Sequence, residues 1–598
     1  MALFMRATSN KYSLFINNCY NKLTITNLKL KPCTDLLRHS VILNFCSQRN
    51  SPENNDHTED QEEILNPFYK FIAYRKREAK RSVIIQVQSP DSYQDLYSYC
   101  AAFGAINQMK FYSASNRGHF FLIEFQDISS QISLINSATH INHNEILPVK
   151  SSMLWFRNVY KKSGKISKNN IPPMPENDII TENRITDSIR SQKSINDQIN
   201  CLYRLSKLED IGIRLRFFTA LQLEATLIGL FPNVTALPFG SSVNGFGKRN
   251  CDLDLILNFE PIKEEKESSR LVFHTKSAMP VERAQTKRSM ETIATLMQHF
   301  MPGVYDVRRI LHARVPIIKY HNSLTDVECD LSMTNMIALY MSELLYLYGE
   351  SDERVRPLVF TIRKWALDVG ITNPSAGPWI TNFSLTLMIL FFLQHEGILP
   401  SLKTLQKLAR KNDIRITENC ANCTFLRDLS KWPKESHNIS LERLLIRFFH
   451  FYANFDFSSR AISLNESTNI AKTDESALYI VNPLEKTLNV SKNVNDLEIR
   501  RFVNATRNAA LLLDDKKSCK RGLIDLFAEK QSSTKHFILR ENENKINIAD
   551  LFEKTHIEQS KDGKKTSNVD NSNKDNVEKS SDESNLAKKG VKIKQVRR

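Results

Sequence analysis

The sequence predicts an α/β protein of the α+β kind, in which a small βαββαβ module, a mixed sheet and a mainly helical region follow one another. Three observations support this prediction. Strand and helix patterns alternate over residues 68–154. Apolar strands that carry acidic residues lie between residues 237 and 335, and helical patterns fill most of residues 352–526. A chain of 598 residues also favours several domains.

Charge and composition narrow the class of protein. Lys and Arg number 82 and Asp and Glu 66, so the formal net charge is +16. A basic excess of this size favours a polyanionic partner, such as nucleic acid or an anionic membrane. The longest apolar run, "FSLTLMILFFL", is shorter than the roughly 20 residues that span a bilayer, so we expect no membrane span. The ten scattered cysteines indicate a reducing compartment.

The N-terminal region is predicted to be a targeting segment. Residues 1–50 contain seven Lys or Arg and a single acid, Asp35, and they are rich in Ser, Thr and Asn. Basic, acid-poor and amphipathic N-termini are typical of mitochondrial presequences, so we expect a transit peptide and a place in the mitochondrial matrix. The acidic stretch "SPENNDHTEDQEE" then predicts a linker over residues 51–64.

The first folded module is predicted over residues 65–155. The order of its strands and helices resembles the plan of RNA-recognition domains. In those domains aromatic side chains on the third strand stack on bases. Here that strand reads "RGHFFLIEF", where Leu122 replaces one stacking aromatic and shares its face with Phe120 and Glu124. The platform is therefore degraded, and we expect a protein–protein role at least as much as RNA binding. A Pro-, Lys- and Asn-rich linker follows over residues 156–184.

Two acids on one strand carry the chemistry of the next region. In "CDLDLILNF", Asp252 and Asp254 are two residues apart, so their side chains share one face of a strand. The leucines between them face a core. Two carboxylates about 6–7 Å apart repel each other unless a divalent cation lies between them. A pair of such ions is the arrangement that promotes phosphoryl transfer.

A third acid and a phosphate-binding turn complete the pattern. In "VECDLSMTN", Asp330 ends an apolar stretch, and a hairpin with the preceding "HARVPIIKYHN" would bring it beside Asp252 and Asp254. Upstream, "PFGSSVNGFG" contains Gly240, which allows close approach of a phosphate, and Ser241, which supplies a hydroxyl and an N–H.

This combination resembles the nucleotidyltransferase palm of the DNA polymerase beta type, and more narrowly the terminal nucleotidyltransferases that add A or U to RNA ends. The stretch "CDLSMTNMIALYMSELLYLYGESDERVRPLVFTIRKWA" resembles the third-acid strand and the first helices of the next domain in that family. "ITNFSLTLMILFFLQ" resembles a core helix, and "NPLEKTLNVSKNV" resembles the nucleotide-recognition segment. The resemblance covers about residues 65–530 and is strongest to the mitochondrial, polyadenylating branch of the family.

The resemblance implies a palm over residues 185–345, a mainly helical poly(A)-polymerase-associated domain over 346–535 and a disordered tail over 536–598. It also implies template-independent addition of AMP from ATP to RNA 3′ ends with Mg²⁺ or Mn²⁺. Asp252 and Asp254 would bind both ions, and Asp330 would bind the catalytic ion and help to deprotonate the RNA 3′-hydroxyl. A homodimer through the RNA-recognition-like domain is implied as well.

The family pattern assigns the nucleotide contacts residue by residue. They are expected at Gly240, Ser241, Asn335, Arg363, Ser384, Leu488 and Asn489. Arg363 replaces a common Lys and Leu367 replaces a second one, so the grip on the triphosphate is either looser or shifted to Arg356, seven residues before Arg363 on the same helical face. Leu488 stands where uridine-adding relatives often have His, which favours ATP. Two alternatives stay open here: a uridylyl or mixed-nucleotide transferase, and a catalytically inactive RNA-binding scaffold.

Overall fold

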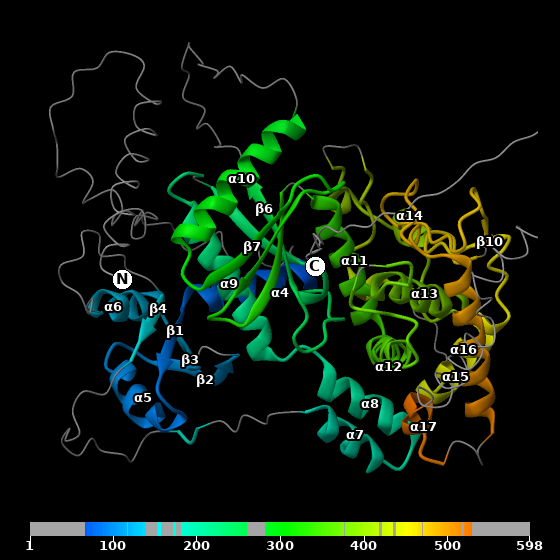
Figure 1. Cartoon of the computed structure of the whole chain (residues 1–598), viewed down its shortest axis with the longest axis horizontal. Helices are drawn as coiled ribbons and strands as arrows, with labels where there is room; N and C mark the ends of the chain where they lie inside the picture. Colours follow the sequence, from blue (N-terminus) through cyan, green and yellow to red (C-terminus); the bar gives the residue numbers. More distant parts are fainter. Residues whose placement is uncertain are drawn as a thin grey trace, which may run out of the picture.

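The computed structural model describes residues 66–528 apart from 116–117, 139–151, 157–171, 175–180, 232, 260–281, 334, 376, 418–420, 434–437, 469 and 516–519. The expected presequence, the acidic linker, the C-terminal tail and most of the 156–184 linker lie outside the described residues. Within them the chain forms a small α/β module, a central sheet and a helical domain (Figure 1). The mixed α/β fold class is therefore confirmed.

The small module has the element order that the sequence predicts. Its sheet has the strand order β2-β3-β1-β4, with β4 short and parallel to β1. Along each strand, successive side chains point alternately to the two faces of this sheet. The elements are β1 (Ser82–Val87), α5 (Tyr93–Ala101), β2 (Ile106–Ala114), β3 (Gly118–Phe125), α6 (Ile128–Ser137) and β4 (Met153–Trp155).

One face of this small sheet packs on its own helices and the other packs on the palm. Phe121, Ile123 and Phe125 lie in a core with α5 and α6. Phe120 and Leu122 point the other way and pack against helix α9 (Asp210–Leu227), where Leu215 and Phe218 meet them. The predicted division of β3 into two faces is confirmed. The face that an RNA-recognition domain presents to RNA is buried here, with Phe120 only 1 % exposed.

The palm is a five-stranded mixed sheet in the order β5-β6-β9-β8-β7. Helices α9 and α10 (Glu282–Phe300) cover one side of it and share its apolar core (Figure 1). The alternating apolar residues of β6 and β9 face those helices, so the intervening polar residues face the other side. The strands are β5 (Val234–Phe239), β6 (Leu253–Phe259), β7 (Val304–Ile310), β8 (Ile317–Asn322) and β9 (Val327–Met333).

The helical domain has one large core around the buried Trp365. The helices α7 and α8, which precede the palm strands in sequence, pack into this core and not into that of the palm. The sequence order alone does not show this, because an amphipathic pattern predicts a buried face without naming its partner. The helices are α7 (Glu182–Arg190), α8 (Ile195–Ser206), α11 (Met336–Ser351), α12 (Val355–Asp368), α13 (Asn382–His395), α14 (Leu402–Lys407), α15 (Leu441–Ala453), α16 (Asp496–Asp514) and α17 (Leu523–Ala528).

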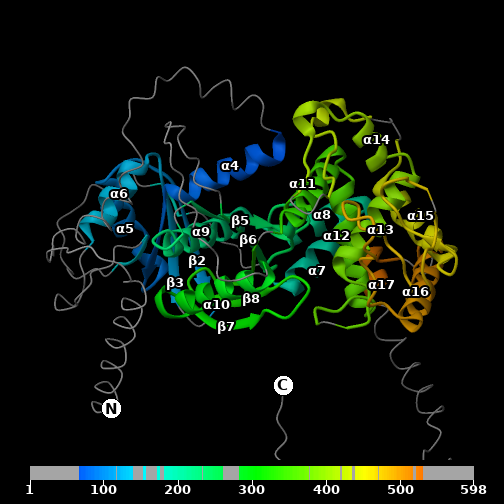
Figure 2. The ribbon, with the colours of Figure 1, turned by 90° about the horizontal axis from the view of Figure 1, so that it is seen from above.

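Helix α4 (Pro67–Lys80) ties the start of the described chain to the palm. Phe68 and Ile72 of this helix pack with Phe217 of α9 and Ile256 of β6. Figure 2 shows α4 running from the small module over α9 toward α11. Although α4 lies in the range predicted for the small module, its apolar side belongs to the palm. No helix in the described part of the chain is long and apolar enough to cross a membrane.

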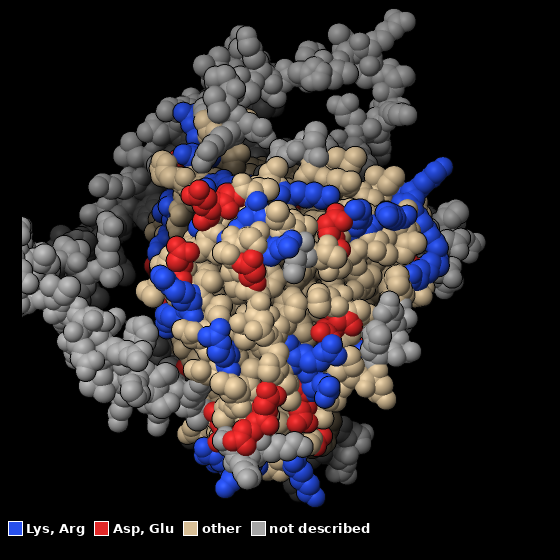
Figure 3. Space-filling model, turned by 90° about the vertical axis from the view of Figure 1, so that its right-hand side faces the viewer, with Lys and Arg blue, Asp and Glu red and all other residues tan. Residues whose placement is uncertain are grey.

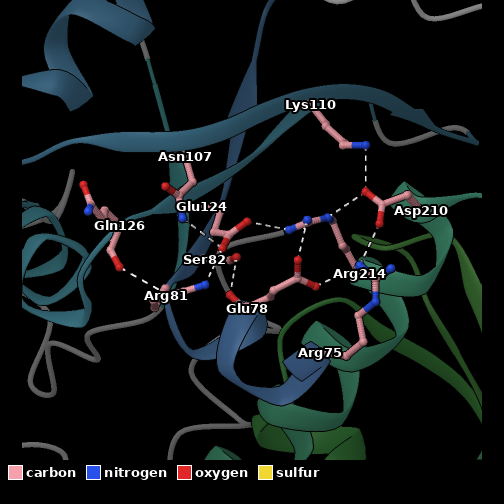
Figure 4. Close-up of polar contacts among 10 residues, drawn as sticks. All are labelled: Arg75, Glu78, Arg81, Ser82, Asn107, Lys110, Glu124, Gln126, Asp210 and Arg214. Carbon is pink, nitrogen blue, oxygen red and sulfur yellow. Dashed lines mark hydrogen bonds and ion pairs between the residues drawn. The ribbon is translucent and has the colours of Figure 1, made fainter. Parts of the chain in front are cut away.

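A network of buried ion pairs fixes the small module on the palm (Figure 4). Arg214 of α9 bonds to Glu124 of β3 at 2.7 Å, to Asp210 at 2.8 Å and to Glu78 of α4. Arg81 and Arg75 add further bonds to Glu124 and Glu78. Because Glu78 and Glu124 are almost fully buried, removing one partner would leave an unpaired buried charge, which is strongly unfavourable. The network therefore fixes the small sheet at one position on α9.

Candidate active site

The predicted acid cluster forms at the edge where β6 and β9 run side by side. These strands are parallel neighbours, and Asp254 lies directly opposite Asp330 in their register. β8 and β9 form the antiparallel hairpin that the sequence predicts. Asp252 precedes β6 and shares the face of Asp254. The structure thus places the three predicted acids together, although their catalytic role stays a prediction.

The acids are held together against their own repulsion. Burial, together with the charges of Asp330 and Asp252, raises the pKa of Asp254 to about 7. Burial also raises the pKa of Asp252, with contributions from Glu328 and Asp330. Within the described part of the chain, neither Asp252 nor Asp254 has an ion-pair or hydrogen-bond partner for its carboxylate. A site with this excess of negative charge is suited to bind cations.

Lys319 supplies the one direct positive partner that the structure shows for this cluster among the described residues. Its Nζ atom lies 2.7 Å from Oδ1 and 2.6 Å from Oδ2 of Asp330. Lys319 is opposite Asp330 in the register of β8 and β9. Sequence reasoning missed this residue, because the cross-strand pairing that places it there depends on the exact hairpin register.

The donor set fits Mg²⁺ or Mn²⁺ in its chemistry. Carboxylate oxygens are the ligands that hard divalent cations prefer, and two of the three carboxylates have no partner in the described chain. No group of three acidic, His or Cys side chains in the described residues is already gathered around one point. The carboxylate of Asp330 is instead paired with the ammonium group of Lys319. Asp252, Asp254 and Asp330 are the residues that would hold the ions.

The Gly-Ser turn lies directly against the acids. Gly240 has φ +65°, and a Cβ atom there would come within 2.4 Å of Oδ2 of Asp254. The position therefore requires glycine both for its backbone conformation and for space. The Gly240 N–H donates to Oγ of Ser342 on α11 at 2.7 Å. The side chain of Ser241 is half-buried and makes no hydrogen bond within the described chain, so its hydroxyl is available to a phosphate.

Two predicted contacts lie where the palm meets the helical domain. Asn335 precedes α11, and its side chain makes no capping bond to that helix. Arg363 of α12 donates to the carbonyl of Phe246 at 2.8 Å and to Asn382 at 3.3 Å. Arg356 lies against Gly245, so both arginines face the same loop, as their spacing predicts. This loop directly follows the Gly-Ser turn.

The remaining predicted contacts are occupied within the protein. Ser384 is fully buried, and its hydroxyl bonds with Thr381. The amide of Asn489 donates to Ser476 and to the carbonyl of Leu478, and its oxygen accepts from two backbone N–H groups. The side-chain amide of Asn489 already donates two hydrogen bonds, so donation from it to a nucleotide would have to replace one of them. Leu488 is half-buried beside them and is free to offer apolar surface.

A salt bridge joins the palm to the recognition segment. Arg314, in the turn between β7 and β8, pairs with Glu485 of the "NPLEKTLNV" stretch. Neither residue was expected to pair from the sequence, since they are 171 positions apart. The bridge brings the β7–β8 turn beside the segment that carries Leu488.

The chain is similar to known proteins over most of its length. Residues 195–350 match the family model "Poly(A) RNA polymerase, mitochondrial-like, central palm domain", and residues 440–490 match "Cid1 family poly A polymerase". The mitochondrial poly(A) RNA polymerase of Drosophila melanogaster is 42 % identical, over 81 % of this chain and 84 % of that protein. The Homo sapiens protein of the same name is 35 % identical, over 73 % and 76 %.

A solved structure of mtPAP in complex with ATPγS is similar to this fold, with a TM-score of 0.71 and 34 % identity. The match covers 77 % of this chain and 99 % of that one. A nucleotidyltransferase sheet with three clustered acids beside a Gly-Ser turn, followed by a helical domain, defines a template-independent nucleotidyltransferase. The chain belongs to the mitochondrial poly(A) RNA polymerase family, and it is an enzyme that transfers AMP from ATP to RNA 3′ ends.

The acid cluster gives the first prediction. Asp252→Ala, Asp254→Ala or Asp330→Ala should each lower the rate of nucleotide addition by more than about 100-fold, because even outer-shell partners of metal ligands cost 10- to 100-fold. Primer extension with ATP measures this rate. Addition near the wild-type rate by any of the three variants would contradict the metal assignment.

The raised pKa of Asp254 also predicts how stability depends on pH. The fold favours the protonated carboxyl of Asp254, because the pKa of this group is about 4 in the unfolded chain and about 7 in the folded chain. In EDTA the wild-type chain therefore loses stability as the pH rises from about 4 to about 7. Asp254→Asn removes that loss. Its thermal midpoint should exceed that of wild type at pH 8, and the difference should shrink toward pH 5. A difference that does not change with pH would show that the charge of Asp254 is not the cause.

Gly240 gives a prediction with an internal control. Gly240→Ala introduces a left-handed alanine and a Cβ atom within 2.4 Å of Asp254, so it should displace that carboxylate. We expect a loss of stability of about 1–3 kcal/mol and a large loss of activity. Gly229→Ala is the control, because a Cβ atom there meets nothing within 4 Å. Equal behaviour of the two variants in activity and urea unfolding would contradict this account.

Proposed function

We propose that this chain polyadenylates RNA in the mitochondrial matrix by nucleotidyl transfer at Asp252, Asp254 and Asp330, with two divalent ions. The observation that carries the proposal is the register of β6 and β9, which sets Asp254 opposite Asp330. The free carboxylates of Asp252 and Asp254 support it. The complete set of three acids argues against an inactive RNA-binding scaffold.

Each part of the site has a separate task in the proposed reaction. The bound ions would stabilise the charge that develops on the transferred phosphoryl group. Asp252 and Asp254 hold them, and Asp330 lies at the side of the cluster that faces β8, where it receives the proton of the RNA 3′-hydroxyl. The Gly240–Ser241 turn holds the triphosphate with backbone N–H and hydroxyl groups. Arg363 and Arg356 add positive charge from α12.

We propose Mg²⁺ or Mn²⁺ as the ion and the mitochondrial matrix as the compartment. Either Mg²⁺ or Mn²⁺ fits a set of carboxylate ligands. The relatives are named as mitochondrial proteins, and the basic, acid-poor first 50 residues support import into the matrix. Import of the full chain into isolated mitochondria, with loss of N-terminal residues, tests this. The domain boundaries are proposed as the sequence analysis gives them, except that α4 and the pair α7–α8 pack across them.

We also propose a homodimer through the RNA-recognition-like module. The face of its sheet is covered by α9, so the dimer contact must use other surfaces of the module. Exposed large apolar side chains there include Tyr99 and Ile128. Sedimentation of the full chain should show a dimer, and Tyr99→Glu or Ile128→Glu should shift it to monomer. A wild-type chain that sediments as a monomer at micromolar concentration would contradict the proposal.

Base selection is proposed to depend on Leu488. An apolar side chain cannot hydrogen-bond the O4 atom of uracil and leaves room for a purine. The structure supports a stable position for Leu488, because its backbone N–H and C=O bond to Glu485 and Asn482 within one tight turn. Related mtPAP structures are described as complexes with ATPγS, GTP, UTP and CTP, so that protein admits all four bases. We therefore expect ATP to be preferred, with measurable use of UTP.

The corresponding prediction concerns Leu488→His. A lost hydrogen bond in a desolvated site costs about 1–3 kcal/mol, or roughly 10- to 100-fold in selectivity. Wild-type enzyme should prefer ATP over UTP by kcat/KM, and Leu488→His should raise the relative use of UTP. Assays with an RNA primer, Mg²⁺ and each nucleoside triphosphate in turn measure the ratio. Leu488→Met is the control, since it keeps the side chain apolar. A wild-type preference for UTP, or an unchanged ratio in the His variant, would refute this account.

A further inference from the structure

The RNA acceptor needs a surface that leads to Asp330, and the small module does not offer its sheet for this. The aromatic and apolar side chains on the outer face of that sheet are buried on α9, with Leu122 only 3 % exposed. Nor does the outer end of the helical domain carry a single basic area. In the view of Figure 3, basic and acidic side chains are interspersed across that face.

The palm sheet continues past Asp330 toward an exposed edge. Direct cross-strand partners form one row over all five strands, and paired residues of neighbouring strands point to the same side of a sheet. The acids therefore share a face with Lys319 and Arg308, and the side chain of Arg308 is 64 % exposed. From β5 to β7 the row is Phe239, Asp254, Asp330, Lys319 and Arg308.

A second row on the same face carries an aromatic surface. Tyr305 of β7 lies opposite His321 of β8, and their ring centroids are 4.6 Å apart. Tyr305 is 44 % exposed. Its neighbours Val304 and Val307 point to the other side and pack on the palm core. β7 is the outermost strand of the sheet, and α10 packs on its opposite side with the palm core.

Acidic residues lie near these rows, and one of them, Asp330, is already paired with Lys319. Asp306 pairs with Arg308 at 2.8 Å on the exposed edge, where such a pair is weak and can exchange for a phosphate. Asp326 lies 3.5 Å from His321 and accepts hydrogen bonds from Ser115 of the small module. Glu328 lies directly opposite His321 in the register of β8 and β9, and its charge also acts on Asp252.

We propose that this face of β7 and β8 is the platform for the 3′ end of the RNA acceptor, with phosphates on Lys319 and Arg308 and a base stacked on Tyr305. The inference rests on the proposed function and names the path of its substrate. Basic groups that follow the backbone, combined with aromatic rings, are the way in which proteins bind single-stranded RNA. The strand of Arg308 lies two strands, about 10 Å, from that of Asp330, so RNA on this face ends at the acid cluster.

Adjacent arginines on β7 provide the test. Arg308 lies on the proposed platform, whereas Arg309 points to α10, where it bonds to Thr295 and Gln298. Binding of a labelled oligoadenylate to the full chain is measured by fluorescence anisotropy in EDTA, over a range of salt. Arg308→Ala should weaken binding about 3- to 10-fold and lower the salt slope by about 1, while Arg309→Ala should leave both unchanged.

Kinetics and a second variant separate this platform from the nucleotide site. Arg308→Ala should raise the KM for RNA and leave the KM for ATP unchanged. Tyr305→Ala should weaken RNA binding at least fivefold, whereas Tyr305→Phe, which keeps the ring, should not. Unchanged binding by Arg308→Ala, or equal losses in Arg308→Ala and Arg309→Ala, would overturn the platform. The binding assay needs no catalysis, so a failure of the proposed adenylation would appear separately, as a wild-type chain that binds RNA but does not extend it.

Discussion

The repulsion among three carboxylates at one end of the palm sheet is the constraint on which the site depends. The register of β6 and β9 brings Asp254 opposite Asp330, and burial of Asp254 weakens the screening of its charge by water. A fold can hold such a group only if positive charge is supplied. Lys319 supplies part of it from the neighbouring strand, and bound divalent ions would supply the rest. The repulsion among the acids would thus favour the binding of divalent ions at this site.

The small module is fixed to the palm by a second use of buried charge. Arg214 neutralises Glu78 and Glu124, which come from two different parts of the chain, and so it joins α4, β3 and α9 at one point (Figure 4). Around this point Phe120 and Leu122 bury their side chains on α9. RNA-recognition domains in other proteins present this sheet face to RNA. In this chain the same face packs on α9 of the palm. The absence of a stacking aromatic at Leu122 is then explained by packing, because that position contacts protein.

Local sequence patterns predicted the features that depend on strand periodicity. They did not predict contacts with residues far along the chain. The spacing of Asp252 and Asp254, and the hairpin that returns Asp330 to them, follow from strand periodicity. The pairing of Lys319 with Asp330 depends on the exact register, and the cover of α9 over Leu122 joins residues about ninety positions apart. The contact of Asn489 with nucleotide stays a prediction, and the structure adds that its amide bonds to Ser476 and Leu478 within the recognition segment. The motif alone does not show these internal bonds.

The turn at Gly240 and Ser241 is held from both domains. On the palm side, Gly240 is packed against Asp254. From the helical side, Ser342 accepts the N–H of Gly240, Arg363 bonds the carbonyl of Phe246, and Arg356 fills the space beside Gly245. A rotation of the helical domain would therefore move the turn and the acid it touches together. The bridge between Arg314 and Glu485 adds a link between the far side of the palm sheet and the segment that carries Leu488. The turn, the acids and the segment that carries Leu488 are thus linked through these few contacts.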